Sequence, residues 1–369
     1  MFRRKNKAEE DTNRVHDGTD NADEGKEKSS KFYKRFAQQE LWGWSPIITG
    51  NVVVIYFLAV AIICIALGVP ILLASIRVKE VKARYDNIDI MSGRSNTEAE
   101  NLLMQPGGVQ YPITMQIPTD MQPPVYVYYE LGKYYQNHKR YVRSRDDNQM
   151  AGKGTGSGKC APEQYVGGNP NPALPQDGAI TPCGLIAWSF FNDSFGDAAS
   201  LAGPGGAPTP VTLDQSDVAW EYDVEHLYGP VQPVNFNTEQ LAASRGGNTS
   251  GTVLNKNEHF IVWMRPAAQP TFRKLWAVID TPLPAGTTLT FNITNQYNTY
   301  RFGGEKALVI STNSWMGGKN MFLGVCYLVI AGIALLVSIG FLTTYHLGCF
   351  GLVKRRKFGD VSQLSWNRS

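Results

Sequence analysis

Two long stretches of the chain contain no acidic side chain, Lys or Arg. Residues 41–76 are 36 consecutive positions of this kind, and residues 320–353 form a second stretch of 34 positions. A helix needs about 20 predominantly apolar residues to cross the hydrocarbon core of a bilayer. We therefore predict transmembrane helices over residues 52–76 and 321–350, which excludes a simple soluble enzyme.

The rest of the chain divides around these two spans. Residues 1–30 are mostly charged and amide side chains, which cannot bury enough apolar surface to offset the entropy of ordering, so they predict a disordered cytosolic tail. Residues 31–51 mix Lys and Arg with aromatic residues, as in a segment lying at the cytosolic membrane interface or an ordinary flank that anchors a span. Residues 77–320 form a large domain, and residues 351–369 form a second cytosolic tail.

The domain between the spans has mainly β patterning. Runs rich in β-branched and aromatic residues predict strands over residues 124–129, 259–264, 287–294 and 306–311. We expect a helix over residues 129–145 and Gly-, Pro- and Ser-rich loops over residues 152–158 and 202–210. The expected fold is a membrane protein with two transmembrane α-helices and a large, mainly-β, antiparallel sandwich-like extracytoplasmic domain with helices and long loops.

The cysteines and glycosylation sequons of this domain indicate its side of the membrane. Lys and Arg residues within about 20 positions of the spans number eight on each side, so the positive-inside rule decides nothing. The domain holds one pair of cysteines, Cys160 and Cys183, suited to a disulfide bond in an oxidising compartment. It also holds N-glycosylation sequons at Asn192, Asn248 and Asn292. We predict a luminal or extracellular domain, glycosylated at these three sites, with both termini in the cytosol.

Composition and motifs narrow the functional classes. A net charge of +3 on 369 residues, 18% of them charged, is too small to indicate nucleic-acid binding. The five His residues have no metal-binding spacing, and no Gly-x-Ser-x-Gly elbow is present. Residues 152–159 fail the phosphate-binding-loop pattern, because Lys153 replaces a Gly and Cys160 replaces the Ser or Thr. The sequence therefore predicts no catalytic residue, metal site or cofactor, and it favours a binding or assembly role.

Two segments are candidates for contacts with a partner or within the chain. Gly324, Ala331 and Ser338 recur every seven positions in the second span, and small residues let helix backbones approach closely. This seam binds either a partner's membrane helix or the chain's own first span. Residues 134–145 alternate cations with aromatic residues, which suits a partner-binding edge or an internal cluster of cation–π and ion pairs.

Several blocks of sequence carry a family resemblance. In chain order they are Gln38-Gln39, Trp44-Ser-Pro46, Tyr134-Tyr-Gln-Asn-His-Lys-Arg-Tyr-Val-Arg-Ser-Arg-Asp146, Pro182-Cys-Gly-Leu-Ile-Ala-Trp-Ser189 with Phe191-Asn-Asp193, Ile261-Val-Trp-Met-Arg265 with Phe272-Arg-Lys-Leu-Trp276, and Trp315-Met-Gly-Gly-Lys-Asn320. Together, over residues 36–342, they resemble the cell division control protein 50 family, the accessory β subunits of type IV P-type ATPase phospholipid flippases.

The resemblance implies a non-catalytic subunit. It implies a heterodimer with the ATPase catalytic subunit, contact with membrane phospholipids, no nucleic acid, and support for the ATPase's folding, exit from the endoplasmic reticulum and catalytic cycle. Many family members have two disulfides in this domain. The Cys160–Cys183 pair matches the bridge that closes onto the Pro-Cys-Gly block, whereas the earlier bridge is absent, so the resemblance implies a divergent member of the family.

A subunit of a two-span ligand-gated ion channel is the alternative, because it shares the expected topology. The spans offer few polar residues to line a pore. We expect an integral membrane protein of the endoplasmic reticulum, the Golgi or endosomes, or the plasma membrane. The candidate partner-binding residues are Phe32, Phe36, Trp42, Trp44, Gly324, Ala331 and Ser338.

Overall fold

The computed structural model describes residues 33–34, 36–38, 50–105, 107–154, 158–237, 246–249 and 251–344. The two predicted tails, residues 1–30 and 351–369, lie outside the described residues. The chain forms two compact units, Met1–Ala61 with Ile333–Ser369 and Ile62–Gly332, and each is described by itself.

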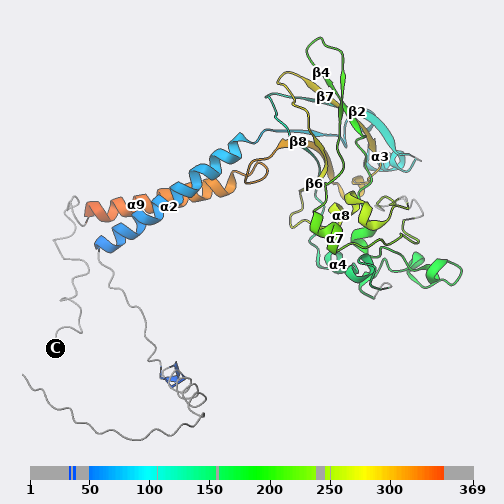
Figure 1. The fold of residues 1–369 in the computed structure, drawn as a ribbon, viewed down its shortest axis with the longest axis horizontal. Helices are drawn as coiled ribbons and strands as arrows, with labels where there is room; N and C mark the ends of the chain where they lie inside the picture. The colour runs from blue at the N-terminus through cyan, green and yellow to red at the C-terminus, as the bar shows by residue number, and fades with distance from the viewer. Residues whose placement is uncertain are drawn as a thin grey trace, which may run out of the picture. The chain divides into compact units, whose positions relative to one another are not determined.

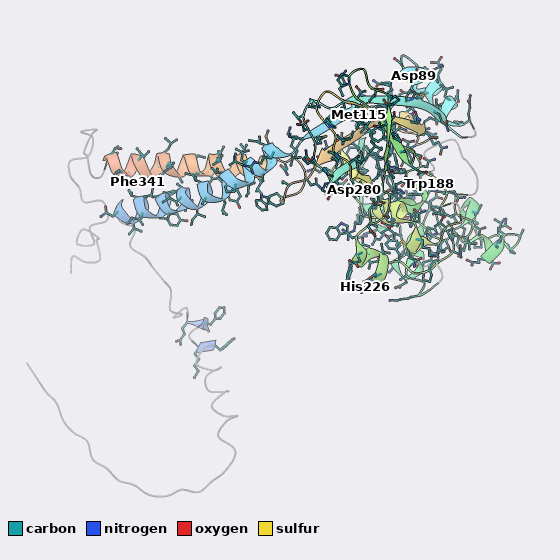
Figure 2. The ribbon with its side chains drawn as sticks, turned by 45° about the horizontal axis from the view of Figure 1, so that its top comes forward. Asp89, Met115, Trp188, His226, Asp280 and Phe341 are labelled. Atoms are coloured by element: carbon teal, nitrogen blue, oxygen red, sulfur yellow. A yellow bond between two sulfur atoms is a disulfide. The ribbon has the colours of Figure 1, made fainter. Side chains whose placement is uncertain are left out.

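Two long apolar helices occupy the stretches predicted to span the membrane. Helix α2 (Gly50–Arg77) and helix α9 (Phe322–Leu342) have mean hydropathies of 3.1 and 2.6 and are long enough to cross a membrane. Large apolar side chains project outward along both helices, among them Phe341 of α9 (Figure 2). Helix α2 ends at Arg77, the first charged residue after the apolar stretch.

Strands and short helices fill the sequence between α2 and α9 (Figure 1). The strands are β1 (Glu80–Arg84), β2 (Val109–Gln116), β3 (Val125–Gly132), β4 (Ala198–Ala202), β5 (Thr209–Thr212), β6 (Phe272–Ile279), β7 (Thr288–Asn295) and β8 (Glu305–Thr312). The α-helices are α3 (Asn96–Leu103), α4 (Lys139–Arg143), α5 (Asp147–Met150), α6 (Leu185–Trp188), α7 (Glu221–His226) and α8 (Glu258–Met264). The 3₁₀ turns are η1 (Asp89–Met91), η2 (Gly158–Cys160), η3 (Val166–Gly168), η4 (Pro175–Gly178), η5 (Leu254–Lys256) and η6 (Tyr300–Phe302).

The strands form two antiparallel sheets of four strands each. One sheet has the order β1-β8-β3-β6, and the other has the order β2-β7-β4-β5. Both outer strands of the second sheet contain proline, Pro112 in β2 and Pro210 in β5. Proline cannot donate a hydrogen bond to a neighbouring strand, so it is tolerated at sheet edges and discourages pairing with another chain.

Both sheets contribute side chains to one hydrophobic core. Strand β2 alternates strictly between buried and exposed positions, so Tyr111, Ile113 and Met115 face inward. Met115 is labelled in Figure 2. In the other sheet, Val125 and Val127 of β3 belong to the same core cluster. This arrangement confirms the expected sandwich-like, mainly-β domain.

Three predicted strands are confirmed, and one is wrong. Strands β3, β7 and β8 occupy the runs at 124–129, 287–294 and 306–311, but residues 259–264 belong to helix α8. The Asn257 side chain accepts a hydrogen bond from the Phe260 amide, at 3.0 Å, and so caps the start of this helix. A short run buried on most sides has no periodicity that separates a strand from a helix, and here the cap decides.

The helix predicted over residues 129–145 is much shorter in the structure. Residues 129–132 continue strand β3, and α4 covers only Lys139–Arg143. Lys133 has a φ of +59°, in the left-handed region, and it ends the strand without starting a helix. The loop predicted at 202–210 connects β4 to β5.

Candidate partner-binding site

The small residues of α9 pack against the chain's own first span. A Cβ on Gly324 would lie 2.9 Å from the Cα of Leu72, so glycine is what allows the two backbones to approach. Ala331 is 2% exposed, and the Ser338 hydroxyl donates to the Val54 carbonyl at 3.3 Å. Of the two alternatives for this seam, the structure therefore shows the internal one.

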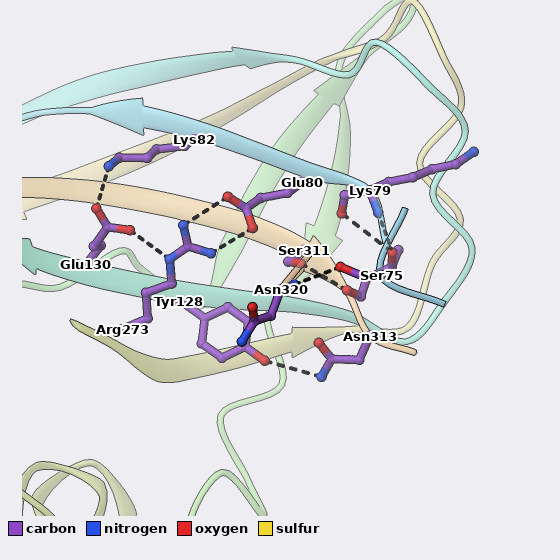
Figure 3. Close-up of polar contacts among 11 residues, drawn as sticks. Ser75, Lys79, Glu80, Lys82, Tyr128, Glu130, Arg273, Ser311, Asn313 and Asn320 are labelled. Carbon is purple, nitrogen blue, oxygen red and sulfur yellow. Dashed lines mark hydrogen bonds and ion pairs between the residues drawn. The ribbon is translucent and has the colours of Figure 1, made fainter. Parts of the chain in front are cut away.

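The pairing of strands β1 and β8 brings together the end of α2 and the segment that leads into α9. Helix α2 leads into β1, and β8 leads into α9, while Glu80 of β1 pairs with Ser311 of β8. Polar contacts hold this junction. The Thr312 amide donates to the Lys79 carbonyl at 2.9 Å, and the Asn320 amide donates to the Ser75 hydroxyl at 2.9 Å (Figure 3).

A line of charged residues crosses the first sheet beside the junction. Arg273 of β6 binds both carboxylate oxygens of Glu80, at 2.7 and 2.9 Å, and one oxygen of Glu130, at 2.7 Å (Figure 3). Lys82 of β1 contacts the other oxygen of Glu130. Burial raises the pKa of Glu130, but the hydrogen bonds from Lys82 and Arg273 outweigh burial and leave it below its usual value. These carboxylates are held as structural acceptors.

A fully buried ion pair lies inside the domain. The Lys306 ammonium is 2.7 Å from a carboxylate oxygen of Asp193, and both side chains are 0% exposed. Asp193 also accepts hydrogen bonds from the Tyr85 hydroxyl at 2.7 Å and from the backbone amides of Gln296 and Tyr297 at 2.6 Å. Sequence reasoning missed this pair, because a lysine at the start of an apolar strand resembles a solvated flank.

The cation-rich segment at residues 134–145, predicted to be a partner-binding edge or an internal cluster, has both buried and exposed side chains. Tyr134 packs inside an aromatic cluster, and the Tyr141 hydroxyl is 2.8 Å from that of Ser189. Helix α4 carries three exposed cations that have no ion-pair partner among the described residues, namely Lys139, Arg140 and Arg143. Tyr134 and Tyr141 therefore pack internally, whereas Tyr135, which is 63% exposed, and the three cations of α4 face outward.

An exposed aromatic surface lies on helix α7. Trp220, at its N-cap, and Tyr222 are 68% and 62% exposed. The Arg265 guanidinium lies 4.4 Å from the centre of the Trp220 ring and binds the buried Asp223 carboxylate at 2.5 and 2.8 Å. Tryptophan, tyrosine and arginine are the residues most enriched where protein interfaces concentrate their binding energy. We name Trp220, Tyr222 and Arg265 the α7 aromatic surface.

A cavity of about 500 Å³ opens at the junction of the spans and the domain. Its α2 wall is apolar, formed by Pro70, Leu73 and Ala74, and Arg77 lies at the end of that wall. Residues 313–315, which follow β8, form the opposite side, with Trp315 74% exposed. No sequence pattern indicates this cavity directly, because its walls come from segments far apart along the chain.

The predicted covalent sites differ in accessibility. Cys160 and Cys183 are bonded in the structure and buried. Asn248 and Asn292 are exposed, whereas Asn192 is half-buried, and its side-chain amide donates to Gln296 at 3.5 Å. Asn292 is exposed because alternate residues of β7 face away from the core.

The remaining candidates concern the N-terminal segment and metal binding. Phe36 is 61% exposed, while Phe32, Trp42 and Trp44 lie outside the described residues. No group of three or more His, Cys, Asp or Glu side chains able to hold a metal ion occurs within the described part of the chain. The clusters that do occur are paired charges and packed aromatic rings.

Fold and site together define an integral membrane protein with two spans and one β-sandwich domain. A sequence profile of the LEM3 (ligand-effect modulator 3) family / CDC50 family matches residues 71–349. That match covers more than half of the 369 residues, so the chain belongs to this family.

Individual relatives match over most of their own length. ALA-interacting subunit 3 of Arabidopsis thaliana is 40% identical over 349 residues, covering 91% of this chain and 90% of the relative. Cell cycle control protein 50B of Homo sapiens is 35% identical over 338 residues, covering 84% and 92%. The phospholipid-transporting ATPase accessory subunit CDC50 of Chaetomium thermophilum is 27% identical over 398 residues, covering 95% and 96%.

Proposed function

We propose that this chain is the non-catalytic β subunit of a phospholipid-translocating type IV P-type ATPase. The observation that carries the proposal is the match to the LEM3/CDC50 family over residues 71–349, together with the similarity to a phospholipid-transporting ATPase accessory subunit along 95% of the chain. The family match favours this function over a subunit of a ligand-gated channel. In this role the chain supports folding, endoplasmic reticulum exit and the catalytic cycle of the ATPase.

The contribution to transport is energetic coupling. A subunit that binds some conformations of the ATPase more tightly than others shifts the populations of its cycle by the difference in binding free energy. The charged clusters described above suit such a scaffold, because Glu130 and Asp193 are both held in ion pairs that brace the domain. Phospholipid asymmetry between the two leaflets would then depend on the assembled complex.

The internal packing of the seam changes which surfaces the partner would contact. Gly324, Ala331 and Ser338 would act indirectly, by fixing α9 against α2, while the outward faces of both helices meet the ATPase and lipid. On the cytosolic side we propose the segment of residues 31–51, with Phe32, Phe36, Trp42 and Trp44. On the domain we propose the α7 aromatic surface.

We also propose a topology. Residues 77–320 would be luminal or extracellular, with both termini cytosolic, in the endoplasmic reticulum, the Golgi or endosomes, or the plasma membrane. The Cys160–Cys183 disulfide supports this orientation, because structural disulfides persist in oxidising compartments. The exposed sequons at Asn248 and Asn292, and the half-buried one at Asn192, would carry N-glycans.

Co-expression tests the proposed function. An ATPase of this class would be expressed alone, with the full chain, with a chain lacking residues 1–44, and with a chain lacking residues 1–30 only. We expect the full chain to raise ATPase yield, ATP hydrolysis and lipid uptake. The shorter deletion, which keeps the aromatic interfacial segment, should match the full chain, whereas the longer deletion should be defective. Equal ATPase yield and turnover with and without this chain would refute the proposal.

A further inference from the structure

The junction cavity lies at the boundary between apolar and polar parts of the chain. Its α2 wall belongs to the last turns of an apolar span, and Arg77 ends that span. When α2 crosses a bilayer, the first charged residue after the apolar stretch lies at the level of the lipid headgroups. The cavity therefore has one apolar wall at acyl-chain depth and one cation at phosphate depth.

Arg77 is available to a ligand. Its side chain is exposed and has no hydrogen-bond or ion-pair partner among the described residues. Neighbouring polar groups differ in this respect, because the Lys79 ammonium donates to the Asp120 carbonyl at 2.8 Å and Asn313 donates to the Tyr128 hydroxyl at 3.3 Å. A guanidinium presents a planar set of donors that matches phosphate oxygens in pairs.

The wall opposite α2 is held in a defined shape. Ser314 and Gly317 exchange backbone hydrogen bonds of 2.9 and 2.8 Å, and the Met316 amide donates to the Ser314 hydroxyl at 3.2 Å. Gly317 has a φ of +99°, which a residue with a side chain adopts only under strain. This tight turn presents Trp315 and Met316, 74% and 42% exposed, beside the cavity. Exposed tryptophan is typical of membrane interfaces.

We propose that this cavity binds one glycerophospholipid of the leaflet on the domain's side. Arg77 would hold the phosphate, and Pro70, Leu73 and Ala74 would contact the upper part of an acyl chain. A volume of about 500 Å³ lies within the range of about 300–1,000 Å³ found for small-molecule sites. The site goes beyond the proposed function, because the phospholipid would bind to the β subunit itself, without being transported by the ATPase.

Photolabelling of the full chain tests this site. The chain would be reconstituted in phosphatidylcholine vesicles that contain a few per cent of either a photoactivatable phosphatidylcholine or a photoactivatable diacylglycerol with the same acyl chains. Labelled peptides would then be mapped. We expect the phospholipid to label residues 70–78 and 313–315 about five- to tenfold more than the diacylglycerol, because only the former offers a phosphate to Arg77.

Variants separate the site from general lipid contact. Arg77→Gln should abolish the preference for the phospholipid, and Arg77→Lys should retain part of it. Lys319→Gln is the matched control, because it removes an exposed cation near the start of α9 that does not line the cavity. Leu73→Trp, which fills the apolar end at a half-exposed position, should reduce labelling by both probes without changing thermal stability.

Four outcomes would overturn the proposal. The first is equal labelling of the wild type and Arg77→Gln by the phospholipid probe, and the second is labelling spread evenly along both spans. The third is loss of phospholipid labelling in millimolar inorganic phosphate, which would show that the cavity binds an anion without lipid. Loss of labelling when the ATPase subunit is co-reconstituted would show that the cavity is occupied by the partner protein. Retained labelling in that complex would support the lipid.

Discussion

Individual buried polar residues hold the domain in one arrangement. Lys306 and Asp193 lie 113 residues apart in the sequence. The Asp193 carboxylate also accepts hydrogen bonds from the Tyr85 hydroxyl and from two backbone amides. A buried charge stripped of its partner is strongly destabilising, since nothing replaces the water it has lost. The stability of the sandwich should therefore be sensitive to single substitutions at this pair.

Replacing the buried lysine tests this dependence. Lys306→Met should lower the free energy of unfolding by about 3–5 kcal/mol, because it leaves the Asp193 carboxylate buried without a cation. Adding Asp193→Asn should cost less than the sum of the two single changes. Denaturant unfolding of the full chain in detergent measures both values, with the exposed Lys256→Met as the control. A change below about 1 kcal/mol for Lys306→Met would contradict the prediction.

His259 should make stability depend on pH. Burial lowers its pKa to about 4, and its ring stacks on Trp276 with centres 4.1 Å apart. Between pH 6.5 and 4 the unfolded chain binds a proton at this residue that the folded chain does not, so stability falls as the pH falls.

The pH effect has a matched control. From pH 6.5 to 5 the wild type should lose about 2 kcal/mol through this group, at about 1.4 kcal/mol per unit. His259→Phe, which keeps a ring against Trp276, should flatten the pH dependence of thermal unfolding, whereas the exposed His138→Phe should leave it unchanged. Identical slopes for the wild type and His259→Phe would show that another group titrates.

At the scale of elements, close backbone contact sets the pairing of the two spans. Gly68 of α2 and Gly324 of α9 each lie where a Cβ would come within 2.9 Å of the other helix. Gly332 of α9 has open space around its Cβ position. On α9, the lack of a side chain therefore allows close helix packing at Gly324 but has no such role at Gly332.

A pair of alanine substitutions separates these two positions. Gly324→Ala should destabilise the α2–α9 pair by about 1–3 kcal/mol, because the added methyl group meets the Leu72 backbone. Gly332→Ala should be neutral or slightly stabilising, because alanine favours helix more than glycine does. Unfolding in graded mixtures of mild detergent and dodecyl sulfate measures the difference. Equal stabilities would mean that the helices tolerate a shift apart.

At the scale of the whole molecule, the glycan pattern reports the orientation in the membrane. We expect glycans at the exposed Asn248 and Asn292, lower occupancy at the half-buried Asn192, and none at Asn367, whose Asn367-Arg-Ser369 sequon lies in the proposed cytosolic tail. Mass spectrometry of peptides before and after enzymatic deglycosylation measures each site. A glycan at Asn367, or no mass shift on deglycosylation, would overturn the proposed topology.

The sequence by itself determined the features that depend on local composition. Stretches of uncharged residues defined both spans, β-rich runs defined β3, β7 and β8, and two cysteines alone in the domain indicated their disulfide. Tertiary structure decided whatever depends on contacts between distant segments. Lys306 of β8 meets Asp193, 113 residues away in the sequence, only in the folded domain, and the junction cavity formed because β1 pairs with β8. The local sequence pattern of a segment indicates which of its positions are buried. It does not identify the segment, far along the chain, that packs against them.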